Sequence, residues 1–505
     1  MNIFPASSLS TRIEMEECMS TAAQFINEAD SKPILSLKQD NMLGGYIYTL
    51  GRVAISKATF MDACCFIDWD LSKITERINE IREIYKWKGL VQVEINNIKQ
   101  KIQKIKREIP LIIRDLVLLH KDYYKLQKLT LKNEFNFLHR KLQEYRTFLD
   151  SLPDDKSIER LASDNLLYTG HGLFSVILPN SFEYRCDTKL SPDGKPFVIS
   201  RGVLLSGTIG KVAIGSSSGS LTHHLYKDYG AKIACDFVTH YQRFTNVLLS
   251  RRGFSIGIED CIPKDTELMQ VEQDKCFLQA KYAMENELDL ELRENKILGN
   301  LNSATKVGEE IAKKSLNKNN NFLSMILSGA KGSIFNVIHS VKSIGQQNVE
   351  GKRIPLNCNG RTLPHFLKEK DIIKSSDNTK EINMLYLQNI FRSRGYITSS
   401  FYSGLTPQEN FFLSAGGREG LTDTSIKTAR CGYISRRILK LLEDVKISYN
   451  STVVNAKGNV VQFCYGYDNY SSSELIKTEK SGYQNTDISH LTDMLNSEFE
   501  WQNRK

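Results

Sequence analysis

Two glycine-rich, basic segments are the first places where the sequence could do chemistry, because exposed backbone amides and lysine side chains bind phosphate groups. The segment from Gly345 to Arg353 superficially follows the P-loop pattern, but its spacing is one residue too long and Arg353 replaces the magnesium-binding Ser or Thr. The segment from Gly329 to Ser333 is too short for that motif, although Lys331 gives it a cation. Anion binding and a plain turn both stay open for this second segment.

Motifs for metal binding and nucleophilic catalysis are incomplete. Asp68 and Asp70 form a lone D-x-D without a third carboxylate. His223 and His224 are adjacent, so in a regular element their side chains point apart. Ser255 lies between glycines, but their spacing differs from that of a nucleophile elbow and favours a tight turn. The sequence therefore predicts neither a metal site nor a serine nucleophile.

The most informative stretch runs from Leu405 to Asp444. Thr406, Pro407 and Glu409 are typical of a helix start: a capping residue, a proline at the first position and an acid in the first turn. Apolar residues then recur at helical spacing, and cations cover much of the remaining surface. Four glycines lie in the same run, and each costs a helix about 1 kcal/mol relative to alanine. Such an inconsistency is typical of a functional site, where a ligand approaches the backbone or the helix bends. The alternative is two shorter helices with a glycine-rich joint. The four glycines are Gly416, Gly417, Gly420 and Gly432.

Length and composition set the frame for these motifs. The chain has 505 residues, of which 41% are hydrophobic and 25% charged, which excludes collagen-like, mucin-like and wholly disordered proteins and allows about three domains. The net charge of +9 permits contact with nucleic acid but does not require it. Ten scattered cysteines without a C-x-x-C motif favour a reducing compartment. Neither a signal peptide nor an apolar run of membrane-spanning length is evident.

Hydrophobic patterning predicts the elements that position the motifs. Residues 33–50 read as a strand-like run, and residues 168–257 as short strands and turns followed by a helix. Residues 71–150 read as long amphipathic helices, an antiparallel hairpin interrupted near Pro110. A basic arm that reaches nucleic acid and a solvated helical hairpin are both open for this region. Residues 264–320 again read as charged helices, and the chain beyond Asp468 as a polar, loosely ordered tail.

The stretch from Leu405 to Asp444 resembles the bridge helix of the largest subunit of multisubunit DNA-directed RNA polymerases. Its pattern T-P-x-E-x-F-F, G-G-R-E-G-L-x-D-T and K-T-A-x-x-G-Y-I-x-R-R is long and specific. Further blocks match the family in its order, in the style of eukaryotic RNA polymerase II and of large DNA viruses. They are Gln39 to Thr49, Thr169 to Pro179, Gly253 to Asp260, Ser328 to Ser333, Gln346 to Pro355, Arg361 to Phe366 and Val460 to Asp468.

The resemblance implies an α+β fold that is multi-domain and mainly helical. The expected parts are a pore domain at 1–70 and 166–252, a helical insertion at 71–165, a funnel domain with a helix pair at 253–330, an active-centre region with the long bridge helix at 331–468, and a polar tail at 469–505. The implied function is part of the largest subunit: a nucleotide-entry pore and funnel, and the bridge helix, for DNA-templated RNA synthesis.

The resemblance also assigns roles to single residues. Thr424 and Ser425 would abut the templating base, although the family usually has alanine at the second position. Lys427, Arg430, Arg436 and Arg437 would meet nucleic-acid phosphates, which are contacts that read no sequence. Gly416, Gly417 and Gly420 would face the mobile trigger loop, and Gly432 would help the helix to flex. Lys331 would lie near the phosphates of the incoming nucleotide.

The family's N-A-D-F-D-G-D motif, which holds the catalytic Mg²⁺, is followed at once by a segment like Met1 to Pro5. We therefore expect the metal aspartates and the trigger loop on other chains, no activity of this chain alone, and no cofactor bound by it. The expected partners are those chains, the second-largest subunit, the DNA template, the RNA product and nucleoside triphosphates, but no membrane. The expected location is intracellular: host cytoplasm or virion for a viral enzyme, otherwise the nucleus. Two rivals stay open: a non-catalytic polymerase fragment that competes with the true subunit, and a helical scaffold protein built around residues 71–150.

Overall fold

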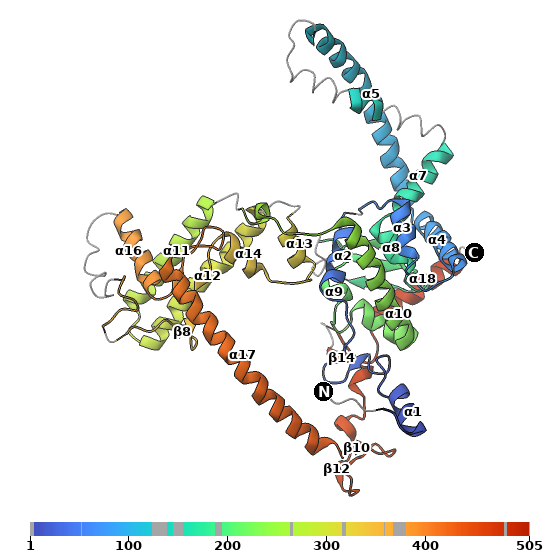
Figure 1. Ribbon diagram of the computed structural model, residues 1–505. Coiled ribbons are helices and arrows are strands. Elements are labelled where there is room, and N and C mark those ends of the chain that lie inside the picture. Colours follow the sequence, from blue (N-terminus) through green and yellow to red (C-terminus); the bar gives the residue numbers. More distant parts are fainter. Residues whose placement is uncertain are drawn as a thin grey trace. The chain divides into compact units, whose positions relative to one another are not determined.

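The computed structural model describes residues 5–51, 53–123, 139–144, 155–186, 194–262, 266–315, 320–357, 359–366, 380–478 and 482–503. These residues form many helices and small antiparallel sheets (Figure 1), so the predicted mainly helical α+β class is confirmed. The chain divides into two compact units. Unit 1 comprises Met1–Gly253 and Ser472–Lys505, and unit 2 comprises Phe254–Ser471. In the described residues, no helix combines the length and the apolar character that a membrane span requires.

Unit 1 is built around α10 (Leu221–Arg252), which bends at Gly230 and packs against α2 (Asp40–Thr49) and α3 (Lys57–Cys64). Beside them, α8 (Gly170–Val176) covers a three-stranded sheet in the order β3-β4-β5. The strands are β3 (Tyr184–Cys186), β4 (Phe197–Ser200) and β5 (Val203–Ser206), and the smaller elements are α1 (Leu9–Glu17), β1 (Ile26–Asn27), β2 (Lys32–Pro33) and α9 (Lys211–Ile214).

The strand-like reading of residues 33–50 is wrong, because α2 is a buried helix. Gly44 and Gly45 allow α10 to approach its backbone closely. A Cβ atom added to Gly45 would lie 1.8 Å from the hydroxyl oxygen of Tyr241, and one added to Gly44 would lie 3.3 Å from the side chain of Leu249. The Gly-Gly pair therefore marks a helix–helix contact.

The region 71–165 is helical where described: α4 (Leu71–Trp87), α5 (Leu90–Tyr123) and α7 (Asp155–Leu167). Buried Arg77 of α4 donates hydrogen bonds to the carbonyl oxygens of Ser175 and Gly202, which fixes this region to the sheet side of unit 1. The predicted interruption near Pro110 is wrong, because α5 continues through it. Proline disturbs one turn at a cost of about 3 kcal/mol, and the buried Ile105 and Ile112 hold the turns on either side.

The last part of the chain returns to unit 1 and is folded there, contrary to the loosely ordered tail that its polar composition suggested. A hairpin of β13 (Ile476–Thr478) and β14 (Gly482–Gln484) leads into α18 (Ile488–Gln502), with η4 (Ser472–Glu474) before it. The hydroxyl of Ser497 contacts the buried carboxylate of Glu183, and the ring of Trp501 packs edge-on against Trp87 at 5.4 Å. These polar and aromatic contacts, together with the buried side chain of Ile476, hold this segment.

Unit 2 centres on a helix pair, α11 (Thr266–Asn286) and α12 (Leu290–Ser315), which packs against α16 (Lys380–Ser393). Phe277, Phe391 and Tyr396 form the aromatic centre of this core. Its other elements are η2 (Ile258–Cys261), α13 (Asn321–Leu327), α14 (Ile334–Val341), β6 (Gly345–Gln346), β7 (Asn348–Val349), β8 (Lys352–Arg353), β9 (Tyr396–Ile397), α17 (Pro407–Leu442), β10 (Lys446–Ile447), β11 (Val453–Val454), β12 (Val460–Gln462) and η3 (Tyr465–Tyr467).

Candidate functional site

Helix α17 is one continuous helix of 36 residues, and it carries most of the predicted site residues. Thr406 is its N-cap, Pro407 occupies the first turn, and Glu409 closes a reciprocal capping box, which confirms the predicted helix start. The alternative of two helices with a glycine joint is wrong, because the four glycines lie inside regular helix. The helix therefore bears the conformational cost of its glycines along an unbroken rod (Figure 1).

The buried carboxylate of Glu409 fixes the N-terminal end of α17. It accepts hydrogen bonds from the amide and hydroxyl of Thr398, both at 3.2 Å, from the hydroxyl of Ser399 at 2.9 Å, and from the amide and hydroxyl of Thr406, both at 3.0 Å. Arg392 lies 3.8 Å away. Burial alone would raise the pKa of Glu409, but these hydrogen bonds and the arginine outweigh it, so the pKa lies below its ordinary value.

The third and fourth turns of α17 rest on the loop around β7. A Cβ atom added to Gly416 would lie 3.3 Å from the side-chain oxygen of Gln347, which is tighter than ordinary contact. The carboxylate of Glu419 accepts a hydrogen bond from the amide of Glu350 at 2.7 Å. Gly416 therefore faces its own chain in part, whereas a Cβ atom at Gly417 or Gly420 would meet open space.

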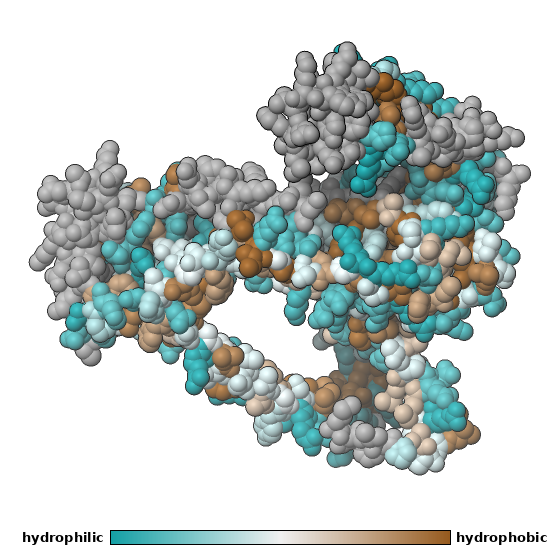
Figure 2. All heavy atoms as spheres, turned by 45° about the horizontal axis from the view of Figure 1, so that its top comes forward, coloured by the Kyte–Doolittle hydropathy of each residue, from teal (hydrophilic) through white to brown (hydrophobic). Residues whose placement is uncertain are grey.

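Beyond the contacts of Gly416 and Glu419, the rest of α17 is exposed. Every residue from Gly420 to Asp444 is exposed, including large apolar side chains that rarely stay exposed together in a stable helix. Figure 2 shows brown apolar side chains among pale and teal ones along this rod. The exposed large side chains of this part of α17 include Leu421, Tyr433, Ile434, Leu439, Leu441 and Leu442. A helix of this kind has the character of an element that other macromolecular surfaces cover.

The regular helix arranges the predicted residues on three faces. Gly417, Gly420, Thr424 and Lys427 follow one another at steps of three and four residues, so they share one face. Ser425 and Arg436 lie three turns apart on a second face, and Arg430 and Arg437 lie two turns apart on a third. We call the first of these faces, which carries Gly417, Gly420, Thr424 and Lys427, the glycine face. Arg436 lies on a different face from the other two arginines.

Local contacts occupy part of this polar set. The hydroxyls of Thr424 and Ser425 donate to the carbonyl oxygens of Gly420 and Leu421, at 2.8 and 3.0 Å. Lys427 pairs with Asp423 one turn earlier, and this hydrogen bond raises the pKa of the lysine. The guanidinium of Arg437 lies 5.6 Å from the ring centre of Tyr433.

Lys331 lies in the tight turn between α13 and α14. Gly329 and Gly332 both have positive φ, at 75° and 80°, a conformation that favours glycine. The side chain of Lys331 is exposed, as a phosphate-binding lysine requires. Among the described residues, no hydrogen bond or ion pair links Lys331 to α17, so the structure does not by itself join the two predicted sites.

The histidine pair is buried. His223 and His224 lie in the first turn of α10, and burial lowers the pKa of His223 to about 4 and that of His224 below its usual range. The ring of His224 lies 4.1 Å from that of His490, whose Nε2 is 2.8 Å from Asp228. In the part of the chain that the structure describes, no three His, Cys, Asp or Glu side chains gather as metal ligands.

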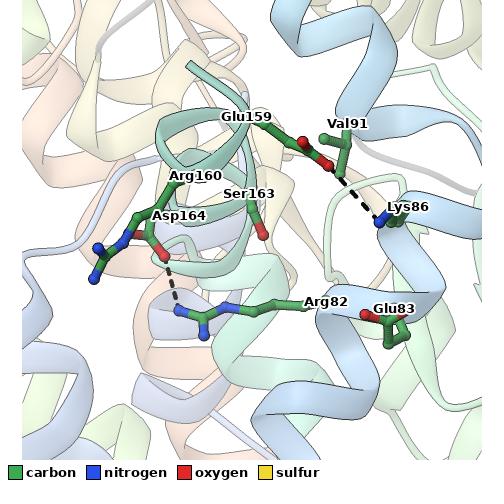
Figure 3. Close-up of a pocket in the computed structure, with 8 residues that line it drawn as sticks. All are labelled: Arg82, Glu83, Lys86, Val91, Glu159, Arg160, Ser163 and Asp164. Carbon is green, nitrogen blue, oxygen red and sulfur yellow. Dashed lines mark hydrogen bonds and ion pairs between the residues drawn. The ribbon is translucent and has the colours of Figure 1, made fainter. Parts of the chain in front are cut away.

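A cavity of about 330 Å³ lies at the base of the 71–165 region, and sequence reasoning missed it (Figure 3). Arg82 pairs with Asp164 at 2.8 Å, and Lys86 with Glu159 at 3.8 Å, between α4 and α7. These two ion pairs join α4 to α7, and the remaining lining charges, Glu83 and Arg160, are opposite in sign. The cavity therefore has no excess charge that would favour an ionic ligand. The significance of Glu409 as a buried acceptor was also missed, although the T-x-x-E spacing carried a signal for it.

Comparisons with known proteins account for most of the chain. Family models match residues 24–261, described as RNA polymerase Rpb1, domain 3; residues 278–377, described as domain 4; and residues 404–490, described as domain 5. The chain belongs to the Rpb1 family. The domain 3 match lies almost wholly in unit 1, and the domain 5 match begins just before α17.

One curated Rpb1 relative is the probable DNA-directed RNA polymerase II subunit RPB1 homolog of Invertebrate iridescent virus 6. It is 35% identical over 390 residues, which make up 74% of this chain and 35% of the relative. The chain therefore spans about a third of the length of the curated relative that it matches. The domain 5 match at residues 404–490 includes the whole of α17.

Proposed function

We propose that this chain forms the nucleotide-entry pore, the funnel and the bridge helix of a DNA-dependent RNA polymerase. The observation that carries the proposal is α17, which is anchored at one end by Glu409 and is exposed from Gly420 onward, in a chain of the Rpb1 family. A rod of this kind can place side chains beside a DNA template while other subunits cover its apolar positions. The paired helices α11 and α12 would form the funnel, and the core around α10 the pore domain.

In this proposal the glycine face of α17 receives the trigger loop, and Thr424 on the same face abuts the templating base. Ser425 lies about 100° further round the helix, so its hydroxyl would border that contact from the side. Lys427, Arg430, Arg436 and Arg437 would contact phosphates on three sides of the rod. Such a distribution suits a helix that passes between strands of nucleic acid, since phosphate contacts are independent of sequence.

Lys331 would offset charge on the phosphates of the incoming nucleotide. Its exposure in the glycine-flanked turn supports this role, because an exposed ammonium group can move to meet a phosphate. By the family resemblance, we assign the catalytic Mg²⁺ to the N-A-D-F-D-G-D motif elsewhere in the assembled enzyme and no step of the chemistry to this chain. The chain by itself is then inactive and works by positioning.

The experiment is purification of the native complex through an affinity tag on this chain, followed by denaturing mass analysis and a template-dependent RNA synthesis assay. We expect the second-largest subunit and a polypeptide that carries the D-F-D-G-D motif to co-purify with this chain. The purified complex should synthesise RNA only when template DNA is added. Co-purification with those subunits without synthesis, and inhibition of the intact enzyme by added chain, would favour the competing-fragment alternative. Recovery without polymerase subunits would contradict both.

A further inference from the structure

Helix α5 carries a heptad pattern of apolar residues, and this pattern defines which side of the helix faces outward. Val91, Ile98, Ile105 and Ile112 are buried and lie exactly seven residues apart. Ile102 and Ile109 fall between them, so the apolar positions alternate at steps of four and three residues. Figure 1 shows α5 extending away from the rest of unit 1. The seam turns one side of this extension inward and leaves the opposite side to solvent.

The returning chain packs on the same seam. Residues 139–144 are helical, and Leu142 among them is buried. Lys141 lies 3.5 Å from Glu108 of α5, so the two segments face each other at this level. The described segment 139–144 therefore lies against the part of α5 that carries its charges, and we call these two segments the arm.

The part of α5 that extends from unit 1 is rich in cations. Between positions 99 and 107, α5 has five cations and no acid, spread over about 12 Å of helix. They are Lys99, Lys101, Lys104, Lys106 and Arg107. Lys106 and Arg107 are exposed and have no acidic partner among the described residues, while Lys104 reaches Glu108 only at 4.0 Å. By contrast, Arg82 and Lys86 in the cavity between α4 and α7 both have acidic partners.

The chemistry of this surface fits phosphates and not bases. Duplex DNA carries one negative charge per about 1.7 Å of its axis, so 12 Å of duplex presents about seven. Proteins that grip single strands add aromatic side chains on which bases stack. From Leu90 to Arg114, α5 contains no aromatic residue. Arg107 lies opposite the buried seam, with Lys104 about 60° to one side of it and Lys106 about 100° to the other. Cations spread over this outer side of a helix, without stacking partners between Leu90 and Arg114, favour the regular backbone of a duplex.

We propose that the outer face of α5, centred on Lys104, Lys106 and Arg107, binds the phosphate backbone of duplex DNA without reading its sequence. The site lies in unit 1, on a different unit from α17, and its function does not require the role proposed for that helix.

The test is binding of the full 505-residue chain to a fluorescein-labelled 25-base-pair duplex, followed by anisotropy from 50 to 200 mM NaCl. The arm variant replaces Lys104, Lys106 and Arg107 with glutamine, which preserves helix propensity. Helicity by circular dichroism checks that the fold is intact. The matched control removes the same charge elsewhere on unit 1, with glutamine at the exposed Lys57, Lys211 and Lys232.

Each phosphate contact contributes about 0.9 to the slope of log affinity against log salt. We expect the magnitude of this slope to be smaller by two to three in the arm variant than in the parent. The ratio of parental to variant affinity should therefore fall about 40-fold between 50 and 200 mM NaCl. The control should keep the parental slope to within one. Equal slopes for parent and arm variant, or equal changes in both variants, would overturn the proposal. A larger effect on a 25-nucleotide oligo-dT than on the duplex would also overturn it, in favour of a single-stranded ligand.

Discussion

Replacing Gly420 by alanine should stabilise α17 and yet slow the assembled enzyme. Gly420 lies within regular helix, and a Cβ atom added there would meet no atom of the described residues within 4 Å. The substitution removes the entropic penalty of glycine, so the local helix should gain about 1 kcal/mol. In the isolated chain, amides around position 420 should then exchange with solvent about fivefold more slowly, as measured by hydrogen–deuterium exchange.

The opposite sign is expected for RNA synthesis. If another segment of the enzyme packs against the glycine face, an extra methyl group overfills that contact, which typically costs 1–3 kcal/mol. That corresponds to an elongation rate about five- to 150-fold lower, measured by single-nucleotide addition in the assembled enzyme. Because no described residue lies near the added methyl group, a clash within this chain does not explain such a loss. A loss larger than the about 1 kcal/mol by which the substitution stiffens α17 would therefore point to an external segment.

Gly299 of α12 provides the matched control. It too is exposed in a regular helix, and a Cβ atom there would meet nothing within 4 Å. Gly299→Ala should give the same slowing of local amide exchange with an unchanged elongation rate. The reasoning fails if Gly420→Ala leaves elongation at the parental rate, because the glycine face would then receive no close neighbour. Faster exchange in that variant would contradict the regular helix itself.

Three further results are expected. Lys331→Ala should lower kcat/KM for nucleotides about 10- to 100-fold in single-nucleotide addition, with Lys331→Arg retaining most of it, because the role needs a cation; an unchanged kcat/KM would exclude it. Glu409→Gln should weaken the start of α17 by about 1–3 kcal/mol at pH 7. Since folding lowers the pKa of Glu409, the parent chain should lose this stability as the pH falls from about 4.3 through the folded-state pKa, and the glutamine variant should show no such loss, measured by amide exchange or denaturation across pH. Trp501→Ala should speed amide exchange throughout α18 at least tenfold, because the ring packs on Trp87 and under Arg201; unchanged exchange would show that other contacts hold α18.

The start of α17 could be predicted from the sequence because helix capping is local. Thr406, Pro407 and Glu409 lie within four residues, and their geometry depends on little beyond the helix itself. The continuity of α17 through four glycines could not be predicted with the same ease. The low helix propensity of glycine favours a break in the helix. The contacts of Glu409 and Glu419 at its N-terminal end, and the good helix formers between the glycines, oppose that break.

Long-range packing accounts for the errors. The Gly-Gly pair of α2 makes sense only beside Tyr241, about 200 residues later in the chain. The folded state of α18 depends on partners such as Glu183 and Trp87, more than 300 residues earlier. The residue pattern within α2 or α18 does not indicate these distant contacts. Local patterns therefore predicted a strand in place of α2 and a loosely ordered tail in place of α18.

The most direct test of the central claim is photo-cross-linking from position 424. A photoreactive amino acid in place of Thr424, in an elongation complex stalled on a defined template, should cross-link to the template strand at the base that pairs with the next nucleotide. The same amino acid at position 299 should give no such product. A cross-link at the templating base would show that α17 lies across the active centre of an RNA polymerase. Equal yields from both positions, or labelling of protein alone from position 424, would contradict that placement.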